Sequence, residues 1–520
     1  MGLLKVDVLA LGMLSAIRRC LDLISAQRGY PFEMQDVPAE DPATYDMICR
    51  ADTVGVFQIE SRAQMSMLPR LRPRTFYDLV IEVAIVRPGP IQGGMVHPYL
   101  NARKDPNNVI YPSPALEEAL KRTLGVPIFQ EQVMQIAMLA AGFSPGESDS
   151  LRRSMAAWKR KGGVHKFHDR LVNGMVERGY TTEFAESIFK QIEGFGEYGF
   201  PESHAASFAL ITYVSCWLKH HEPACFLTAM LNSQPLGFYS ASQLVQDAKR
   251  HGIRVLPVDV MASAWDCGLE AEADAARQQA VRLGLRLVAG LKESAAQRII
   301  AARLFSPFAS TEDMALRAEM DAGDLKALAS ADALAALSGH RRQQVWSASA
   351  LQASPPLLVG VPVDEDFLEL PGASEGEEVV FDYAATGLTL RRHPLAILRP
   401  QLAKMGLLTS AQLHHLPNGR WVRACGIVTM RQQPQTAKGV VFVTLEDETG
   451  NVNVIVWKSL REEQRSELLK SRLMAVYGTW QRDDGIAGSG GGEVRHLIAQ
   501  RLVNLTPLLG RLGTASRDFH

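Results

Sequence analysis

Several features are missing from this 520-residue chain, and each absence removes a class of protein. The six cysteines are scattered with no Cys-x-x-Cys pair, which excludes a recognisable zinc motif and indicates free thiols in a reducing compartment. No apolar run approaches the ~18 residues that a membrane span requires. Lys5 and Asp7 interrupt the first apolar run, unlike a secretory signal peptide. We therefore expect a cytoplasmic protein with no membrane contact.

The chain also lacks an excess of either charge, with 55 Lys and Arg against 56 Asp and Glu. This balance excludes a protein that coats nucleic acid along its whole length, so any polyanion-binding surface must be local. Hydrophobic residues make up 47% and charged residues 21% of the chain, an ordinary composition for globular domains. The length predicts roughly three or four such domains.

One short stretch departs strongly from this neutrality. Residues 150–170 contain a single acid, Asp169, and seven cations, which are Arg152, Arg153, Lys159, Arg160, Lys161, Lys166 and Arg170. A loop of alternating glycine and aromatic residues follows at 194–200, and Ser203-His204 then begins a long apolar helix. Clustered cations beside a helix N-terminus favour a phosphate-binding site. A solvated basic helix face is the alternative.

Residues 46–233 have a mainly helical pattern with breaks at proline and glycine. Ser144–Glu147 has the composition of a turn and N-cap, and the helix that it begins carries the arginine pair. Ser203 is the predicted N-cap of a helix that runs to His220. Because that helix is apolar on all sides, we expect it to be buried and to present its N-terminus to a site.

The pattern changes in the middle of the chain. Residues 240–260 indicate a helix followed by a strand, and residues 283–303 indicate two helices joined by a tight turn at Ala289-Gly290. A second, looser helical pair follows. The first pair matches a helix-hairpin-helix, in which the glycine allows the turn and the amides of the second helix face a phosphate. Gly290 and Lys292 are therefore predicted nucleic-acid contacts, with a plain helical hairpin as the alternative.

Residues 352–380 are rich in Pro, Gly and acids, which is typical of a linker. From Trp421 onward the apolar period switches to two, and turn residues separate several strands with one interposed helix. This order resembles an OB-fold barrel, which commonly binds single strands by stacking bases on aromatic rings. Phe442, Trp457 and Tyr477 are the candidate rings, and a place in the barrel core is the alternative for each.

The sequence is poor in the carboxylates that phosphoryl transfer to a hydroxyl requires. Such a reaction uses two divalent ions roughly 4 Å apart, which carboxylates bind, and cationic side chains that bind the phosphates. Asp7 lies on a predicted strand with Lys5 on the same face. No Asp-x-Asp pair on a β-strand accompanies it, and the acidic run at 364–366 lies in the linker and is a poor candidate.

Several longer motifs, taken in order, point to one family. The chain resembles the C-family bacterial DNA polymerases, the relatives of the DNA polymerase III alpha subunit, in the segments KVDVLALGML, GVFQIES, VRPGPIQGG, FQEQVMQIA, SLRRSMAAWK and FGEYGFPESHAASFALITYVSCWLK. The resemblance covers roughly residues 1–235, and the hairpin region and barrel follow in the family's order. The form VRPGPIQGGMVHPYLNARK resembles the error-prone, damage-response branch.

The resemblance implies a role for the residues at the start of the chain. Asp7 matches a catalytic palm aspartate that binds Mg²⁺ in a two-metal site, and Lys5 matches the palm lysine near the triphosphate. The paired palm aspartates, the thumb and an N-terminal histidinol-phosphatase-like domain should precede Lys5 in this family. We therefore expect Met1 to be an internal start, most of the metal site to be supplied by absent residues, and the chain alone to be inactive.

The resemblance also assigns the basic stretch and the helix after it. Arg152 and Arg153 match fingers arginines that contact the phosphates of the incoming dNTP. Tyr198 and His204 match positions that line the nucleotide pocket. Guanidinium forks suit phosphate oxygens, and a helix N-terminus adds positive dipole to the same cavity. The basic run Lys159–Lys161 is expected to contact primer-template DNA.

The implied architecture is a multidomain α+β fold with a mainly α-helical fingers domain, a helix-hairpin-helix module and a C-terminal OB-fold β-barrel. The expected domains are the end of the palm at 1–15, the fingers at 16–235, a clamp-binding-like domain containing the helix-hairpin-helix at 236–350, a linker at 351–400 and the OB-fold at 401–520.

The resemblance predicts an error-prone DNA-directed DNA polymerase that acts in DNA repair, replication and translesion synthesis after DNA damage. The clamp-binding motif of the family is degenerate at 356–359, so we expect indirect contact with a sliding clamp through accessory mutagenesis proteins. A non-catalytic DNA-binding scaffold is the alternative, because helix-hairpin-helix and OB modules bind DNA without chemistry.

Overall fold

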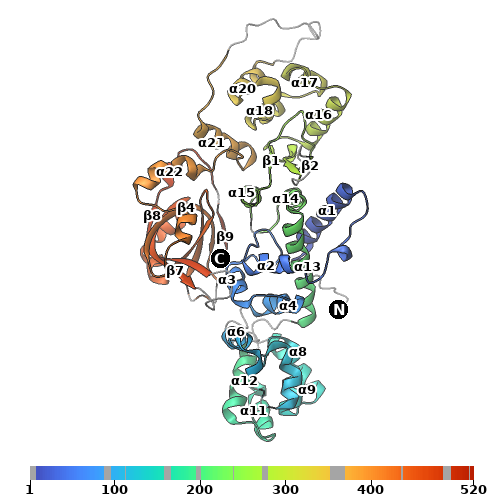
Figure 1. Cartoon of the computed structure of the whole chain (residues 1–520), viewed down its shortest axis with the longest axis vertical. Coiled ribbons are helices and arrows are strands. Elements are labelled where there is room, and N and C mark those ends of the chain that lie inside the picture. The colour runs from blue at the N-terminus through green and yellow to red at the C-terminus, as the bar shows by residue number, and fades with distance from the viewer. Residues whose placement is uncertain are drawn as a thin grey trace.

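The computed structural model describes residues 8–86, 95–109, 111, 113–156, 165–194, 201–237, 239–271, 279–351, 369–434, 437, 439–483, 494–514 and 516–519. A helical body lies at the centre, a helical lobe lies at one end of the long axis, and the hairpin helices lie at the other end (Figure 1). The β-barrel lies beside the body (Figure 1). Among the described helices, none has the length and hydropathy needed to span a membrane.

The central body packs its helices around α13. Its elements are α1 (Leu11–Arg28), α2 (Pro42–Cys49), α3 (Arg62–Leu71), α4 (Phe76–Ile85), α13 (Glu202–His221), α14 (Pro223–Asn232) and α15 (Ala241–Arg250). The side chains from Ile211 to Lys219 in α13 are all buried, which confirms the predicted burial for the second half of the helix, whereas Leu210 in the first half is 45% exposed. Pro223 cannot continue a helix from its interior but is suited to the first turn, so α14 begins there.

The end lobe consists of six described helices, which are α6 (Val96–Lys104), α7 (Pro114–Leu120), α8 (Gln130–Ala141), α9 (Pro145–Ala156), α11 (His168–Val176) and α12 (Thr182–Gly194). Helices α8 and α11 approach closely at Gly174, where a Cβ atom would lie 2.3 Å from the carbonyl oxygen of Ala141. Glycine at this position therefore allows the two helices to pack against each other.

The region after α15 contains a small sheet and the hairpin helices. Strands β1 (Val255–Leu256), β2 (Gly268–Glu270) and β3 (Ala280–Arg282) pair in the order β1-β3-β2. They are followed by η5 (Leu285–Leu287), α16 (Glu293–Phe305), α17 (Thr311–Arg317), α18 (Ala322–Ser330), α19 (Ala335–Ser338) and α20 (Arg341–Ala350). The predicted first helix of the hairpin is only the 3₁₀ turn η5, so that part of the prediction is wrong.

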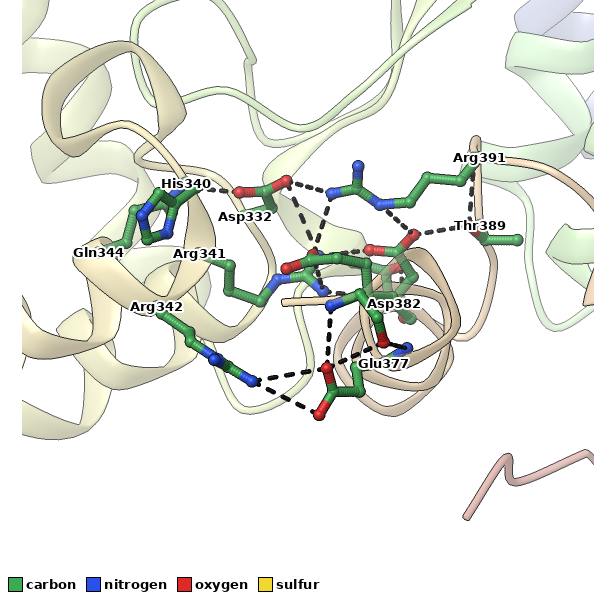
Figure 2. Close-up of polar contacts among 12 residues, drawn as sticks. Asp332, His340, Arg341, Arg342, Gln344, Glu377, Asp382, Thr389 and Arg391 are labelled. Carbon is green, nitrogen blue, oxygen red and sulfur yellow. Dashed lines mark hydrogen bonds and ion pairs between the residues drawn. The ribbon is translucent and has the colours of Figure 1, made fainter. Parts of the chain in front are cut away.

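The prediction of a linker at 351–400 is also wrong for much of this range. It contains α21 (Glu375–Thr386) and the start of α22 (Pro394–Lys404), and α23 (Ser410–His414) follows. Ser374 and Glu377 form a capping box that begins α21. Acidic residues of α21 are held by arginines from neighbouring segments, so the acids that resemble a linker composition are internal ion-pair partners (Figure 2).

The C-terminal part is a closed barrel, which confirms the OB-fold. Its strands are β4 (Trp421–Gln432), β5 (Val441–Glu446), β6 (Asn451–Val456), β7 (Leu473–Asp483) and β8 (Val494–Asn504), with β9 (Arg517–Phe519) at its edge. They pair in the order β5-β6-β8-β7-β4-β9, and the β5–β4 pairing closes the barrel. The helical segment before β7 forms two helices instead of one, α24 (Lys458–Glu463) and α25 (Arg465–Lys470).

The hydrophobic cores do not follow the expected domain boundaries. One core runs continuously from Met13 to Leu388, through the boundary expected at residue 235. Helix α1 passes through the boundary expected at residue 15. The barrel has its own interior core, and a second cluster joins the outside of the barrel to α21 and α22.

Candidate functional site

Helix α9 carries the predicted phosphate-binding arginines and begins at a local capping pair. The Ser144 N–H donates to Glu147 Oε2 at 2.7 Å, and the Glu147 N–H donates to Ser144 Oγ at 3.3 Å. This arrangement confirms the turn and N-cap predicted there and satisfies amides that the first turn leaves without helical partners. The start of α9 is therefore set by its own sequence.

Both arginines of α9 hold the same carboxylate. Arg152 Nη2 lies 2.8 Å from Asp149 Oδ1, and Arg153 Nη2 lies 2.5 Å from Asp149 Oδ2. Hydrogen bonds from Arg152 and then Arg153 hold the pKa of the Asp149 carboxyl below its ordinary value. The Arg153 side chain is 75% exposed, so its ion pair is well solvated and weak. A multiply charged phosphate group can therefore replace Asp149 as the partner of these guanidinium groups.

The start of α13 differs from the prediction. The helix begins at Glu202 with Pro201 as its N-cap residue, and no side chain caps it. Ser203 already lies inside the first turn, so its predicted N-cap role is wrong. The Glu202 backbone N–H instead donates to Glu131 Oε2 of α8 at 3.1 Å, because a tertiary contact supplies the acceptor.

Polar contacts from two further segments hold the N-terminus of α13. The Tyr77 hydroxyl of α4 donates to Glu202 Oε1 at 2.8 Å, and Arg122 Nη1 lies 3.0 Å from the same oxygen. The guanidinium of Arg122 also lies 4.0 Å from the centre of the Tyr77 ring. Burial and the hydrogen bond to Glu202 raise the pKa of Tyr77, so its hydroxyl stays protonated and remains a donor.

Helix α8 links the two predicted elements of the site. Glu131 at its start binds the first turn of α13, and Met134 accepts a hydrogen bond from Ser148 Oγ of α9 at 3.2 Å. Helix α9, which carries the arginines, and helix α13, which carries His204 on its first turn, therefore both contact α8.

His204 lies on the first turn of α13 and is partly buried. Its ring centre lies 4.3 Å from that of Phe208, which packs edge-on against Phe57 at 5.1 Å. Phe57 belongs to the GVFQIES motif, and its backbone N–H donates to Ser215 Oγ of α13 at 3.1 Å. Two motifs that are far apart in the sequence thus form one aromatic cluster beside His204.

Several predicted site residues lie outside the described residues. These are Lys5, Asp7, Lys159, Arg160, Lys161 and Tyr198. Their assignments to catalysis, Mg²⁺, the triphosphate and DNA stay predictions.

The hairpin residues Gly290 and Lys292 lie at the opposite end of the molecule from α9. Gly290 has a φ of +86°, a conformation that favours glycine, and Lys292 is the N-cap residue of α16. The Ala289 N–H donates to the carbonyl oxygen of Ala385 at 2.8 Å, which fastens the turn to α21. Gly290 and Lys292 line a groove of about 940 Å³ together with Trp346 and other residues. Both therefore lie on an accessible surface.

The three predicted aromatic candidates of the barrel have different environments. Trp457 is 53% exposed and precedes α24, Phe442 on β5 is partly buried, and Tyr477 on β7 is partly buried. Tyr477 packs against the core cluster between the barrel and α22, which favours the alternative of a core position for that ring, whereas exposed Trp457 has no such place. The large ring inside the barrel is Trp480, which is 1% exposed.

An ion cluster between the α2–α3 loop, α13 and α15 was not predicted. Lys219 Nζ lies 3.2 Å from Asp52 Oδ1 and 2.9 Å from Asp247 Oδ2, and His251 Nε2 lies 2.6 Å from Asp52 Oδ2. Asp52, Asp247 and His251 are close enough to share a metal ion, the one such group within the described parts of the chain. The buried ammonium of Lys219 already pairs with both carboxylates, and His251 pairs with one of them, so we interpret the group as a structural salt-bridge cluster.

Another contact that was not predicted joins α3 to the barrel. Arg62 Nε lies 3.0 Å from Thr444 Oγ1 of β5, a pair separated by 382 positions in the sequence. Desolvation by burial lowers the pKa of Arg62. No local pattern indicates such a pair, because the partners meet only when the barrel packs against the helical body.

Family profiles match three segments of the chain. A profile described as "Bacterial DNA polymerase III alpha subunit finger domain" matches residues 13–179, which include α9. A "Helix-hairpin-helix motif" profile matches residues 252–344, and an "OB-fold nucleic acid binding domain" profile matches residues 422–502. The three matches follow the order expected from the sequence motifs.

Curated proteins named "Error-prone DNA polymerase" are similar to the whole chain. The protein of Bordetella bronchiseptica is 62% identical over 524 residues, that of Burkholderia pseudomallei 60% over 535 residues, and that of Alkalilimnicola ehrlichii 58% over 520 residues. These alignments cover 100% of this chain and 49%, 49% and 50% of the respective relatives. The chain thus spans about half the length of the curated relatives that it matches.

The structure contains a helical domain, a hairpin module and a barrel in this order. The sequence motifs, the matched profiles and the relatives indicate the same three parts. At 58–62% identity along the complete chain, the arrangement of these parts is inherited from a common ancestor. The chain therefore belongs to the C-family of bacterial DNA polymerases, as a relative of the DNA polymerase III alpha subunit and of the error-prone DNA polymerases.

Proposed function

We propose that this chain forms the part of an error-prone DNA polymerase that binds the incoming nucleotide and the DNA. In this role it contributes to the transfer of a nucleotide from dNTP to the 3′-hydroxyl of a primer, in translesion synthesis and damage-induced mutagenesis. The supporting observation is the identity of about 60% to error-prone polymerases over the whole chain, combined with a finger-domain match that contains the arginine pair of α9. A cytoplasmic location follows from this role.

In the proposed site, Arg152 and Arg153 exchange Asp149 for the phosphates of the incoming dNTP. Guanidinium groups suit this task because their planar donors match phosphate oxygens in pairs. His204 lines the same pocket at the start of α13, where the helix dipole favours negative charge. Lys5 and Tyr198 complete the nucleotide contacts, and the basic run Lys159–Lys161 holds the primer-template DNA.

The test is the affinity of the purified chain for a fluorescent dNTP. Replacing Arg153 with Ala should weaken dNTP binding by about tenfold or more, since a charge-assisted hydrogen bond contributes roughly 1.5–3 kcal/mol. The matched control is Arg18→Ala on α1, because Arg18 is also exposed and also pairs with an aspartate four residues away, at 3.0 Å. This control should leave dNTP affinity unchanged.

A second candidate function, a non-catalytic DNA-binding scaffold, is supported by the hairpin and barrel matches. The same variants separate the two functions when binding to a primer-template duplex is measured in parallel. Loss of DNA affinity without loss of dNTP affinity in Arg153→Ala would favour the scaffold and contradict the nucleotide site.

We also propose that the chain alone does not extend a primer. The chemistry would be supplied by two Mg²⁺ ions, and this sequence offers Asp7 as its one matching carboxylate. The purified chain should bind primer-template DNA and should not incorporate nucleotides at a measurable rate. Robust incorporation would contradict this proposal. Accessory mutagenesis proteins and, through them, a sliding clamp are the further partners that we propose.

A further inference from the structure

The hairpin module carries a groove that lies far from the proposed nucleotide site. Its volume is about 940 Å³, within the range of cavities that take ligands. The turn at 289–292 forms one part of the groove, and residues of α18, α20 and α21 form most of the rest. Helices α18 and α20 lie at the end of the molecule opposite α9 (Figure 1). We call this hollow the hairpin groove.

Large apolar side chains are exposed on the walls of the hairpin groove. Trp346 of α20 is 53% exposed, and its neighbour Val345 is 38% exposed. Phe381 of α21 is 41% exposed, and the Arg341 guanidinium carbon lies 5.7 Å from the centre of its ring. Exposed apolar residues that gather in one hollow mark a protein interaction site, and Trp is enriched among binding hot spots. The walls therefore favour a ligand with apolar side chains.

Most of the remaining apolar lining consists of small residues. They are Ala289, Gly290, Gly323, Ala327, Ala384 and Ala385. A Cβ atom added at Gly290 would meet no atom of the described residues within 4 Å, so the groove is open at this turn. Small side chains leave room for large side chains of a ligand and let its backbone approach closely. The hairpin groove therefore has space for the bulky side chains that its walls favour.

The charged residues of the lining favour a negative ligand. Its two acids are used by the fold, because Asp321 Oδ1 accepts the Asp324 N–H at 2.7 Å at the start of α18 and the Asp324 side chain is only 6% exposed. Lys292 and Lys326 are exposed, and neither has an ion-pair partner within the described parts of the chain. Carboxylates of a ligand can therefore pair with these two lysines.

The lining distinguishes a protein ligand from DNA. Gly290 and Lys292 are predicted phosphate contacts, and backbone phosphates need only cations and amide donors. Duplex DNA offers no large apolar side chain to pack against Trp346 and Phe381. An amphipathic helix presents apolar side chains on one face and charged side chains beside them, which matches both features of the hairpin groove. The groove therefore suits an acidic amphipathic helix.

We propose that the hairpin groove binds an acidic amphipathic helix of a partner protein. Apolar side chains of that helix pack against Trp346 and Phe381, and its carboxylates pair with Lys292 and Lys326. The ion pairs of Arg341 with acids of α21 fix α20 against α21, so the walls are in place before the partner binds. This interaction is independent of the proposed nucleotide site, which lies at the other end of the molecule (Figure 1).

The test measures binding of the purified chain to a fluorescently labelled peptide of about 16 residues, with leucine on one helical face and glutamate elsewhere. Trp346→Ala should weaken binding by at least about tenfold, as expected for the loss of an aromatic hot spot. Trp346→Phe keeps a ring and should stay within about threefold of the wild type. The matched control is Trp421→Ala, because Trp421 is similarly exposed, at 49%, and lies on the barrel. This control should bind like the wild type.

Charge reversal tests the lysines separately. Lys326→Glu should weaken binding of the acidic peptide by about fivefold, and the difference should shrink as the salt concentration is raised. A peptide with lysine in place of every glutamate should bind the wild type more weakly. Thermal unfolding of each variant separates loss of the groove from loss of the fold. If Trp346→Ala lowers the unfolding temperature, the exposed Lys326→Glu substitution still tests the site.

Three peptide results would overturn the proposal. They are no binding of the acidic peptide to the wild type, equal affinity for the lysine peptide, and equal effects of Trp346→Ala and Trp421→Ala. Displacement of the peptide by duplex or single-stranded DNA, with a matching loss of DNA affinity in Trp346→Ala, would identify a nucleic-acid surface and would also overturn it. The dNTP affinity of Trp346→Ala should be unchanged, so a failure here is distinguishable from a failure of the nucleotide site.

Discussion

Two arginine clusters in this molecule are both paired with carboxylates, yet they differ in burial. On α9 the arginine pair holds Asp149, and the side chain of Arg153 is 75% exposed. At the hairpin module, Arg341 and Arg391 hold acids of α21, and the side chain of Arg341 is 3% exposed. The comparison shows how one residue type serves two purposes. An arginine in a solvated ion pair can exchange its carboxylate for another anion. A buried ion pair instead stabilises the fold, because removal of one partner leaves an uncompensated buried charge.

Figure 2 shows the buried cluster in detail. Arg341 Nη1 lies 2.8 Å from Glu378 Oε2, and Arg341 also contacts Asp382. Arg391 Nη2 lies 2.7 Å from Asp332 Oδ2 and 3.1 Å from Glu378 Oε2. The two guanidinium groups thus bridge the α18–α20 segment, α21 and the loop after it. This bridge explains why a segment with the composition of a linker is folded.

The largest effect is expected from breaking the buried cluster. Arg341→Ala leaves Glu378 and Asp382 without their main cation, and loss of one partner of a buried ion pair costs roughly 3–5 kcal/mol. The free energy of unfolding in urea measures this loss. The neighbouring Arg342 is a matched control, because it is 41% exposed and lies 3.4 Å from Glu377. Arg342→Ala should cost less than about 1 kcal/mol.

The cost of Arg341→Ala should also depend on pH. Burial raises the pKa of Glu378 even though the arginines oppose this shift. Without Arg341 the folded-state pKa rises further, so Glu378 becomes neutral by binding a proton as the pH falls. The difference in stability from the wild type should therefore be smaller at about pH 4.5 than at about pH 7.5. A pH-independent difference would show that Glu378 does not depend on Arg341.

A smaller effect is expected from removing the carboxylate of the exposed cluster on α9. Asp149→Asn removes the carboxylate that competes with phosphate for the guanidinium groups of α9. The dNTP affinity should rise by about two- to fivefold, while the free energy of unfolding changes by less than about 1 kcal/mol. Titration with a fluorescent dNTP measures this change. A lower affinity would mean that Asp149 positions the arginines instead of competing for them.

The smallest effect is expected at a pair of intermediate burial. His251 is 39% exposed, and its hydrogen bond to Asp52 raises its pKa. A raised folded-state pKa stabilises the protein below the unfolded value of roughly 6.5 and loses this effect as the pH rises through the folded value. His251→Gln should lower the unfolding temperature by on the order of 1 °C at about pH 6 and by nothing measurable at about pH 9. Asp247 also faces this histidine, and Lys219 pairs with Asp247.

Local patterns were sufficient for many elements of the fold. The capping pair before α9, the end of α13 near His220 and the period-two strands of the barrel depend on residues close in sequence, and all were predicted. The N-cap of α13 was predicted wrongly as Ser203, because the amide acceptor at the helix start is Glu131 from another helix. Among the candidate site residues, Arg153 was selected because its neighbours along the chain are also basic, and its role stays a prediction.

The sequence by itself determined the family, the order of the parts and the position of the arginine pair on a capped helix, because each of these depends on neighbouring residues or on ordered motifs. Only the tertiary structure decided that Arg62 of α3 contacts Thr444 of the barrel and that the ring of Tyr477 lies near both Arg423 and Arg501. The physical reason is distance along the chain. Burial and strand register bring such residues together, and neither is encoded in a local pattern.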